Sequence, residues 1–368
     1  VAVEEDGRRS GVGFLFPRLL ASGRDTAFTL RYHTLTGRRI GRSHRATPAA
    51  ITAAVRERLT ESAEVVFYDP LAELHYAPSH TAVGVLDIGR PSATEAMKIR
   101  YVQQEIWGNP PEFLYPSDIH SLEFGSGTSL VARVDGELAG FLFGFAKHGG
   151  PPLPADWNDR FQGKLRLESQ TMGVLSDYRG LRIGNLLKRM QAEAALEQGI
   201  GVVHWTVDPL QFPNAALNFG LLRGLAFNFY PDFYPFRNEL NLVHASRFAI
   251  TWLVGSRHVQ EVPLLDSRSL ILDLHHHRQV ARVNRGWTDV NYMLQNEMIA
   301  FEIPINWTQL QQESREEAMA WREITDRIFS HYVGDELGQY VISGVGRDGD
   351  RRFLIGERVR PELWERLG

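Results

Sequence analysis

Apolar and polar residues alternate from Leu165 to Val174, a period that predicts a β-strand. The alternation stops at Ser176, a short glycine-containing loop follows, and a helical pattern begins near Asn185. The first amides of a helix have no partner within the helix, and the helix dipole adds partial positive charge there. A strand, a loop and a helix N-terminus in this order predict a site for a phosphate or pyrophosphate. An ordinary strand-to-helix turn has the same pattern, so this segment alone leaves both interpretations open.

The first 90 residues predict a small αβ unit. Its expected strands are Val12–Leu20, Ala27–Leu35, Glu64–Tyr68 and Thr81–Ile88. Thr47 followed by Pro48 signals a helix start, and apolar residues recur at helical spacing from Ile51 to Leu59. The arginine-rich segment 38–45 fits either an anion site or a solvated hairpin, and the hairpin is favoured.

Residues 91–255 predict a longer αβ unit. Ser92 or Thr94 can cap its first helix, and Asp135-Gly136 is a strong tight-turn signal between two strands. Gly199 is a natural residue to end the later helix. The expected elements are a helix over 92–106, strands at Ser129–Val134 and Glu137–Phe145, a helix at Asn185–Gln198, a strand at Gly201–Val207, a helix at Asn214–Leu222 and an aromatic segment at Phe227–Phe236.

Residues 256–368 predict a C-terminal αβ extension. Its expected elements are strands at Ser269–Leu274 and Ile299–Ile303, a single long helix at Trp307–Phe329, and a final hairpin of Gln339–Val345 with Arg351–Ile355. His275, His276 and His277 could bind a metal, but no acidic or histidine partner stands at helical spacing, so a surface loop is favoured. The sequence thus predicts three units: 1–90, 91–255 and 256–368.

Composition narrows the class of protein. Of the 368 residues, 43% are hydrophobic and 23% are charged, values typical of a globular protein. The net charge of −4 argues against a general nucleic-acid binder, which would normally be basic. The absence of cysteine excludes disulfides, zinc–thiolate sites and thiol nucleophiles. No signal peptide is evident, and no apolar run approaches the roughly 18 residues of a membrane span. We therefore expect a cytoplasmic protein without a membrane partner.

The loop after the central strand reads Tyr178-Arg179-Gly180-Leu181-Arg182-Ile183-Gly184. Together with the order of elements, it resembles the pyrophosphate loop of the GNAT superfamily, whose members are acyl-CoA-dependent N-acyltransferases. The following segments are similar to a subgroup of predicted bacterial GNAT acetyltransferases of unassigned substrate: Trp205–Gln211 with Asn214, Ala215 and Asn218, Ser246–Phe248 with Trp252, Glu302–Pro304, and Ala320–Arg322. The resemblance covers residues 92–356 and leaves residues 1–90 unassigned.

The resemblance implies an α/β (α+β) fold of GNAT type, with a mixed, mostly antiparallel sheet flanked by helices. In that fold the strand containing Gly173 would splay from its neighbour, Gly201–Val207. Acetyl-CoA would bind in the splay as a co-substrate, and no metal would be needed. Strand backbone groups would bind the pantetheine amides, and loop amides would cradle the pyrophosphate. The implied cofactor-binding residues are Met172, Gly173, Val174, Arg179, Gly180, Leu181, Arg182, Ile183, Gly184 and Asn214.

Two residues depart from the family pattern. The loop usually reads Q/R-x-x-G-x-G/A, and Arg182 stands where the middle glycine is expected. That glycine lets the pyrophosphate approach the backbone closely. Arg182 could swing outward and pair with a phosphate, or it could fill the cradle and weaken CoA binding. The usual tyrosine acid, seven residues after Asn214, is replaced by Leu221. Tyr234 or Tyr230 would then protonate the leaving thiolate, although both also suit aromatic packing.

Glu168 is the best candidate for the general base, because many family members carry an acid on this strand. If the strand is regular, Glu168 shares a face with Met172. The alternative is a structural ion pair with Arg166 or Arg160. The second candidates for the base are His120 and Glu123.

Three further roles are implied near this strand. The backbone N–H near Val174 would stabilise the oxyanion. Asn214 would contact the pantetheine arm, or it would cap the helix in which it lies. Asp208 would cap the turn before Pro209 or bind the acceptor amine, and the turn is favoured.

The sequence therefore predicts an acetyl-CoA-dependent N-acetyltransferase that acylates the amine of a small-molecule or amino-acid-like acceptor by direct attack in a ternary complex. The alternative is a degenerate GNAT module that binds CoA or another ligand, or serves in oligomerisation, without catalysis. Arg182 and Leu221 favour this alternative. A peptide acceptor would need an open groove, on which the sequence is silent. A homodimer is compatible with each interpretation, and we expect no nucleic-acid partner.

Overall fold

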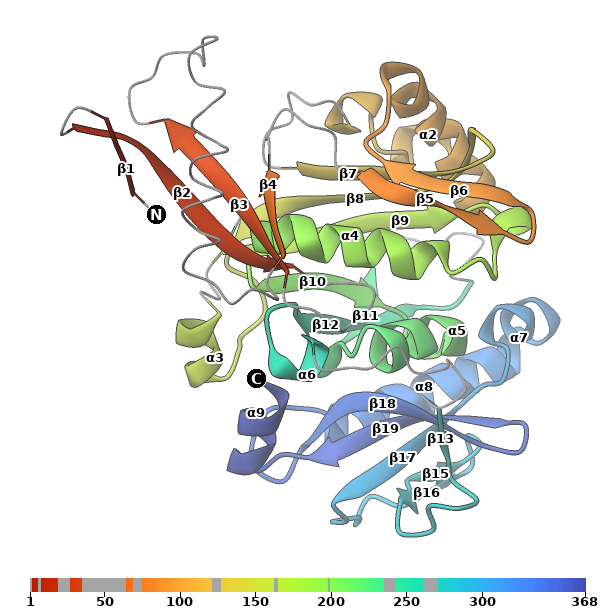
Figure 1. The fold of residues 1–368 in the computed structure, drawn as a ribbon. Coiled ribbons are helices and arrows are strands. Elements are labelled where there is room, and N and C mark those ends of the chain that lie inside the picture. The colour runs from red at the N-terminus through yellow and green to blue at the C-terminus, as the bar shows by residue number, and fades with distance from the viewer. Residues whose placement is uncertain are drawn as a thin grey trace.

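The computed structural model describes residues 2–5, 8–18, 27–34, 64–68, 75–120, 127–161, 165–197, 199–234, 242–260 and 271–368. The arginine-rich segment 38–45, the helix expected near 51–59 and the candidate base Glu123 lie outside these ranges. Figure 1 shows a large sheet that runs through the molecule and a smaller sheet near the N-terminus.

Most strands belong to one mixed sheet of 13 strands. They are β5 (His75–Thr81), β6 (Gly84–Gly89), β7 (Gly127–Val134), β8 (Glu137–His148), β9 (Leu165–Val174), β10 (Val202–Val207), β11 (Leu225–Tyr234), β12 (Ala245–Leu253), β13 (Ile271–Asp273), β14 (Ala281–Arg282), β17 (Met298–Ile303), β18 (Tyr340–Asp348) and β19 (Arg351–Arg358). Their order in space is β14-β17-β19-β18-β11-β12-β10-β9-β8-β7-β6-β5, and β13 pairs with β18. Because most of the pairs are antiparallel and helices flank the sheet, the predicted fold class is confirmed.

The N-terminal sheet is separate from the main one. It contains β1 (Ala2–Glu5), β2 (Arg8–Arg18), β3 (Ala27–Thr34) and β4 (Glu64–Tyr68). Strands β5 and β6 belong to the main sheet instead, because β6 pairs with β7. The main sheet therefore begins at His75, ahead of the boundary expected at residue 90, and the boundary itself stays a prediction. A further two-stranded ribbon is formed by β15 (Asn284–Arg285) and β16 (Asp289–Val290).

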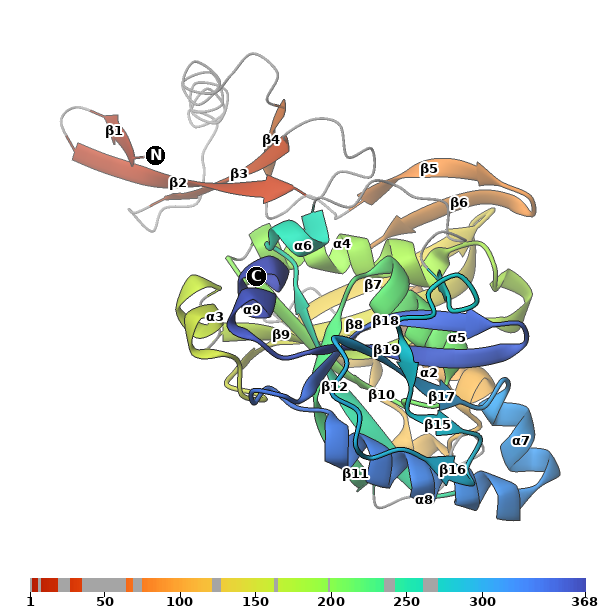
Figure 2. The same cartoon turned by 90° about the horizontal axis from the view of Figure 1, so that it is seen from below.

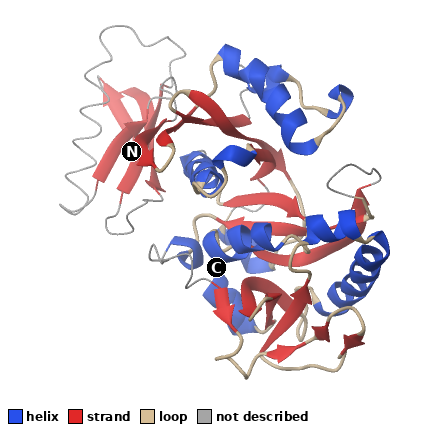
Figure 3. Cartoon of the chain, turned by 90° about the vertical axis from the view of Figure 1, so that its right-hand side faces the viewer, coloured by secondary structure: helices blue, strands red, loops and turns tan. Residues whose placement is uncertain are grey.

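Helices cover both faces of the main sheet, as Figure 3 shows. Among the described residues, the helices before residue 261 are α2 (Ala93–Trp107), α3 (Ala155–Arg160), α4 (Ile183–Glu197), α5 (Phe212–Ala215) and α6 (Arg257–Gln260). On β7, Leu130 packs in a cluster with Leu187 of α4, whereas Val131 packs with Ile99 of α2. Since successive strand residues point to opposite faces, α4 and α2 cover opposite faces of the sheet. Among the described residues, no helix has both the length and the apolar character needed to cross a membrane.

Local sequence signals placed several of these elements correctly. Ser92 accepts a hydrogen bond from the amide of Glu95, whose carboxylate accepts one from the amide of Ser92, so α2 begins with a capping box. Asp135 and Gly136 have φ angles of 50° and 85°, as a tight turn between β7 and β8 requires. Gly199, with φ of 73°, follows α4.

The C-terminal strands and helices share a core with the rest of the molecule. Their helices are α7 (Trp307–Glu313), α8 (Arg315–Tyr332) and α9 (Pro361–Leu367). One apolar cluster contains Ala192 of α4, Trp252 of β12, Phe329 of α8 and Leu354 of β19. Figure 2 shows α8 beside β11, which is also the strand that pairs with β18. The C-terminal unit is therefore packed against the central strands.

Two predicted helices differ in the structure. The single helix expected over 307–329 is wrong: it breaks at Ser314, whose hydroxyl caps α8 by accepting a hydrogen bond from the amide of Glu317. The helix expected at Asn214–Leu222 begins earlier, as α5, and continues as a π-helix, η5 (Ala216–Leu221). Strand β12 was not predicted, because all its residues are buried and no alternation marks it.

Candidate active site

The parallel strands β9 and β10 separate along their length. Leu167 pairs with Val203 and Glu168 with His204, and no later residues of these two strands pair. Each strand keeps its other neighbour, since β9 pairs with β8 as far as Val174 and β10 pairs with β12 to its end. The splay that the resemblance implies is therefore present. Its two edges carry backbone groups that are not used for pairing across the gap.

A bulge in β9 decides which of its side chains lie on the face of the sheet that α4 covers. The register with β8 shifts between Phe143 and Phe145, so β9 carries an extra residue there. Leu167 and Met172 lie in apolar clusters with α4, and Ser169 accepts a hydrogen bond from Lys188 of α4. The regular alternation that we expected is therefore wrong. Glu168 points away from α4 and does not share a face with Met172.

The loop after β9 presents amides without partners. The segment contains a 3-10 turn, η4 (Ser176–Tyr178), after which the amide of Arg179 donates to the carbonyl of Ser176. Among the described residues, the amides from Gly180 to Asn185 have no hydrogen-bond partner. The side chains of Arg179 and Arg182 are exposed, and neither has a polar partner in the described part of the chain. This end of α4 thus combines free donors with two unpaired cations.

Arg182 has a left-handed backbone conformation that favours glycine. Its φ angle is +61°, and Gly180 in the same loop has +88°. A side chain in this left-handed region costs about 1 kcal/mol, so the loop keeps its shape against the preference of arginine. Gly184, at the end of the loop, is so close to β9 that an added Cβ would lie 3.4 Å from Cε of Met172. The loop backbone and the strand edge are therefore adjacent.

Gly173 lets α2 pack closely on β9. An added Cβ at this position would lie 2.6 Å from Cδ1 of Ile106 and 2.9 Å from Cε1 of Phe141. Both distances are shorter than ordinary Cβ contacts, so a larger residue here would require Ile106 and Phe141 to move. The residue that we expected to offer its backbone to pantetheine thus also fixes the strand against the helix behind it.

Glu168 lies beside polar residues on the face opposite α4. Its carboxylate is 3.3 Å from Nζ of Lys147 on β8. Neither Arg166 nor Arg160, the ion-pair partners expected from sequence, takes this position. Arg166 instead donates to Nε2 of His204, which fits a neutral imidazole since burial lowers the pKa of His204 to about 4.

Tyr115 is hydrogen-bonded to Gln170 of β9, the strand that carries Glu168, and was missed by sequence reasoning. Its hydroxyl accepts a hydrogen bond of 2.5 Å from Nε2 of Gln170. Burial raises the pKa of Tyr115, and the nearby charges of Tyr234 and Glu168 raise it further, although Gln170 opposes this. No local pattern marks Tyr115, which stands between two short 3-10 turns, η2 (Pro111–Phe113) and η3 (Ser117–His120).

Tyr234 borders the splay from β11. Its hydroxyl lies 3.2 Å from Oγ1 of Thr206, in the part of β10 that no longer pairs with β9. The guanidinium carbon of Arg247 lies 4.8 Å from the centre of the Tyr234 ring. Tyr230, the alternative acid, packs against Phe233, and burial raises its pKa.

A buried lysine stands at the vertex of the splay. Lys188 of α4 donates to Oγ of Ser169 at 2.7 Å, and its Nζ lies 3.5 Å from the centre of the Trp205 ring. Ser169 and Trp205 are the first residues of their strands beyond the last paired ones. Burial lowers the pKa of Lys188 well below its ordinary value, and only the charge of Glu168 opposes this. Sequence reasoning missed Lys188, although its helical spacing from Gly184 and Gln191 could have placed it on the buried face of α4.

The other candidate residues from the sequence lie outside the splay or have structural partners. Asn214 is exposed within α5, whose N-cap residue is Gln211, so the capping interpretation of Asn214 is wrong. His120 is buried, contacts Oγ of Ser129, and has its pKa lowered to about 4 by burial. His275 and His276 are exposed in the turn after β13, as the surface-loop interpretation expected.

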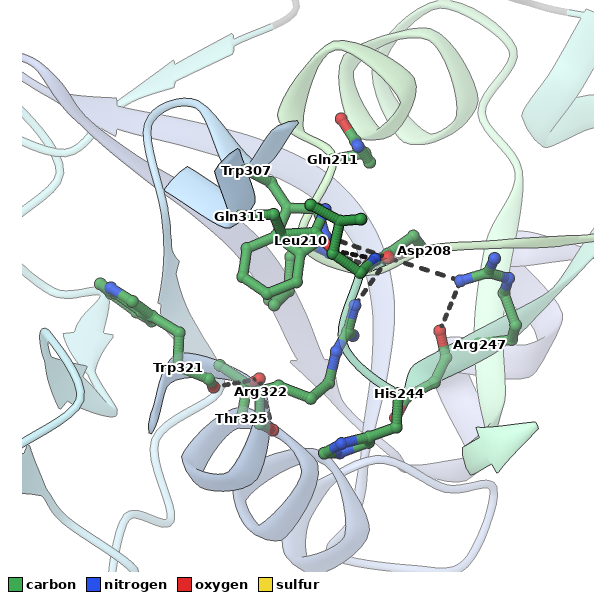
Figure 4. Close-up of polar contacts among 12 residues, drawn as sticks. Asp208, Leu210, Gln211, His244, Arg247, Trp307, Gln311, Trp321, Arg322 and Thr325 are labelled. Atoms are coloured by element: carbon green, nitrogen blue, oxygen red, sulfur yellow. Dashed lines mark hydrogen bonds and ion pairs between the residues drawn. The ribbon is translucent and has the colours of Figure 1, made fainter. Parts of the chain in front are cut away.

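Asp208 is held in a buried ion cluster, shown in Figure 4. One carboxylate oxygen accepts from the amide of Leu210, which confirms the turn. The other accepts from Arg322 at 2.6 Å and from the indole of Trp307 at 3.2 Å, and Arg247 lies 3.4 Å away. Both oxygens are engaged inside the protein, so the turn is favoured over a bond to the acceptor amine.

Part of this chain matches a known family model, and the chain also resembles solved structures. Residues 95–218 match the model of the Acetyltransferase (GNAT) family. No curated protein matches the chain. The ribosomal-protein-S18-alanine N-acetyltransferase of Escherichia coli is 13% identical, with 46% of this chain and 95% of that chain covered and a TM-score of 0.35. Arabidopsis thaliana NAA60 in complex with acetyl-CoA is 17% identical, with 46% and 99% covered and a TM-score of 0.38. The splay and its loop lie within the segment, residues 95–218, that matches the Acetyltransferase (GNAT) family model.

Proposed function

We propose that this protein is an acetyl-CoA-dependent N-acetyltransferase that acylates the amine of a small-molecule or amino-acid-like acceptor. One observation carries the proposal: the splay between β9 and β10 is followed directly by a loop with free amides from Gly180 to Asn185. The strand edge can pair with an amide-bearing arm, and the helix N-terminus can hold a pyrophosphate. Acyl-CoA combines both parts, and the GNAT domain at residues 95–218 supports it as the ligand.

The residues present fit such a ligand. The edge of β9 at Met172, Gly173 and Val174 would pair with the pantetheine amides, and exposed Asn214 would contact the same arm. The amides of Gly180, Leu181, Arg182, Ile183 and Gly184 would bind the pyrophosphate. Of the two expected roles of Arg182, the outward one is favoured, because φ of +61° preserves the glycine-like backbone and the side chain is exposed. With Arg179, it would donate charge-assisted hydrogen bonds to phosphate oxygens.

The chemistry requires a base and an acid on the acceptor side. Glu168 would take the proton from the amine, directly or through water, as its nitrogen attacks the thioester carbonyl. The backbone N–H near Val174 would stabilise the oxyanion. When the carbon–sulfur bond breaks, Tyr234 would give its proton to the thiolate, and its hydroxyl would be oriented by Thr206. Tyr115 and Gln170 would border the acceptor beside Glu168.

The second candidate function is a GNAT module that binds CoA or another ligand without catalysis. Leu221 favours it, because this residue stands in η5 where many family members carry the acid. The two functions differ in whether a residue on another strand supplies the proton. Tyr234 on β11 could supply that proton, so we favour the active enzyme.

Release of CoA thiol from acetyl-CoA, followed with a panel of primary amines and amino acids, tests the proposal. We expect amine-dependent release that falls by roughly 10²- to 10⁴-fold in Glu168→Gln. Acetyl-CoA affinity should stay unchanged in this variant, because Glu168 is not part of the loop. Amine-dependent release at an equal rate in both proteins would remove Glu168 from the role of base. Binding of acetyl-CoA without amine-dependent release would favour the non-catalytic module.

A further inference from the structure

Three segments far apart in the sequence meet at Asp208 (Figure 4). Asp208 follows β10, Arg247 lies on β12, and Arg322 lies on α8 of the C-terminal unit. Arg322 donates to Oδ2 of Asp208 at 2.6 Å, and Nη1 of Arg247 lies 3.4 Å from the same oxygen. One carboxylate therefore holds two guanidinium groups, one from the acyltransferase core and one from outside it.

The cluster is buried and depends on its charges. The side chain of Arg322 is 1% exposed and that of Asp208 is 8% exposed. Burial alone would raise the pKa of Asp208, but Arg322 and Arg247 outweigh it and hold the pKa below its ordinary value. Trp307 of α7 adds an indole hydrogen bond to the carboxylate, and its ring lies against the guanidinium of Arg322. Loss of Arg322 would leave Oδ2 of Asp208 with Arg247 and Trp307 as its remaining partners.

Arg247 extends the cluster to the active site. Its Nη1 donates to the carbonyl of Ser246 at 3.0 Å, and its guanidinium lies over the ring of Tyr234. The hydroxyl of that ring reaches Thr206 at the splay. A cation over an aromatic face is attracted by the electrons of the ring, so the position of Arg247 constrains the ring. When Tyr234 gives up its proton, the same cation faces the negative charge that remains.

We infer that the C-terminal unit completes the active site by positioning Tyr234 through Arg322, Asp208 and Arg247. The inference rests on the proposed function, in which Tyr234 is the acid. Arg322, Asp208 and Arg247 are positioning residues, since they act on the reaction through the tyrosine. The acyltransferase core would thus need α8 for catalysis, although the loop and the strand edge that would bind acyl-CoA do not include it.

The first test measures the position of Tyr234 without any reaction. 3-Fluorotyrosine is placed at position 234, and its ¹⁹F resonance is recorded in the full chain, in Arg322→Met and in Arg327→Met. Arg327 lies on the same helix with its side chain 70% exposed, so its substitution is the matched control. We expect the resonance to move in Arg322→Met, to stay in place in Arg327→Met, and to return toward the wild-type position in Arg322→Lys. If Arg322→Met does not fold, Trp307→Phe removes one hydrogen bond to Asp208 and serves instead. A resonance that stays in place in the folded variant overturns the inference.

The second test separates positioning from general damage. With acetyl-CoA and the best amine of the panel, Arg322→Met should lower kcat about 10-fold or more while KM for acetyl-CoA stays within about 2-fold. In a Tyr234→Phe background, Arg322→Met should have no further effect on kcat. An equal loss in both backgrounds would show a structural role only and would overturn the inference. If the wild type does not bind acetyl-CoA, the proposed function fails. The ¹⁹F shift alone then still decides whether α8 positions the side chain of Tyr234.

Discussion

The loop after β9 and the cluster around Asp208 both contain several charged groups, but only those of the cluster are paired with each other. Arg179 and Arg182 are exposed and, among the described residues, have no polar partner, and the neighbouring amides also lack partners. At Asp208, by contrast, buried cations share a buried carboxylate and an indole N–H. Charge without partners at a helix N-terminus suits an anion that arrives from solution, whereas paired charge in the interior holds elements together. Substitutions in the two regions should therefore affect different properties.

The largest effect on stability should come from the buried cluster. Asp208→Asn keeps the shape of the side chain but leaves Arg322 and Arg247 without their counter-charge, so the free energy of unfolding should fall by about 3–5 kcal/mol. Urea denaturation measures it. Arg182→Ala in the exposed loop is the control and should change stability by no more than about 0.5–1 kcal/mol. Equal losses in the two variants would contradict the contrast between the regions.

The exposed loop should instead control affinity. Each of Arg179→Ala and Arg182→Ala should weaken acetyl-CoA binding about 10-fold, the expected worth of one charge-assisted hydrogen bond. Because the contacts are with phosphates, the loss should shrink as ionic strength rises. Calorimetric titrations at low and high salt measure both effects. Full affinity in the double variant would show that the two cations do not serve the pyrophosphate.

Lys188 combines features of the two regions: like Asp208 it is buried, and like the loop after β9 it lies near the splay. Burial lowers its pKa. The folded protein releases this proton at a lower pH than the unfolded chain, whose lysine has the ordinary pKa of 10.5. Below that pH the unfolded chain binds more protons, so this group destabilises the fold increasingly as pH falls. Lys188→Met removes the effect. Its stability relative to wild type should therefore increase from about pH 10 to about pH 7 in urea denaturation. A difference independent of pH would contradict the lowered pKa.

The smallest expected effect concerns the backbone of the loop. Arg182 has φ of +61°, so Arg182→Gly should relieve strain of about 1 kcal/mol and lose about half of that to chain entropy. Arg179 has φ of −69°, so Arg179→Gly should only lose stability. Paired thermal denaturation of these two variants should give changes of opposite sign. Changes of the same sign would show that the side chain of Arg182, rather than its backbone, decides the stability of the loop.

What the sequence could predict follows from the range of the interactions involved. The capping box at Ser92, the turn at Asp135 and the loop before α4 depend on neighbours in the chain, and their patterns were readable. The splay followed from family resemblance. The bulge in β9 depends on pairing with β8, and the position of Tyr115 depends on Gln170, so neither leaves a local pattern. Segments around Asp208 resembled a subgroup in sequence, but only the fold brings them together.

Calorimetric titration of acetyl-CoA into the wild-type chain and into Arg182→Gly tests the central claim most directly, because Arg182 stands where the family carries glycine. The account predicts that the wild type binds one acetyl-CoA and that Arg182→Gly binds it no more tightly, since the exposed arginine adds a phosphate contact and its φ of +61° already preserves the cradle. A wild type that does not bind, beside a glycine variant that does, would show that Arg182 blocks the site and would contradict the assignment of an active acetyltransferase.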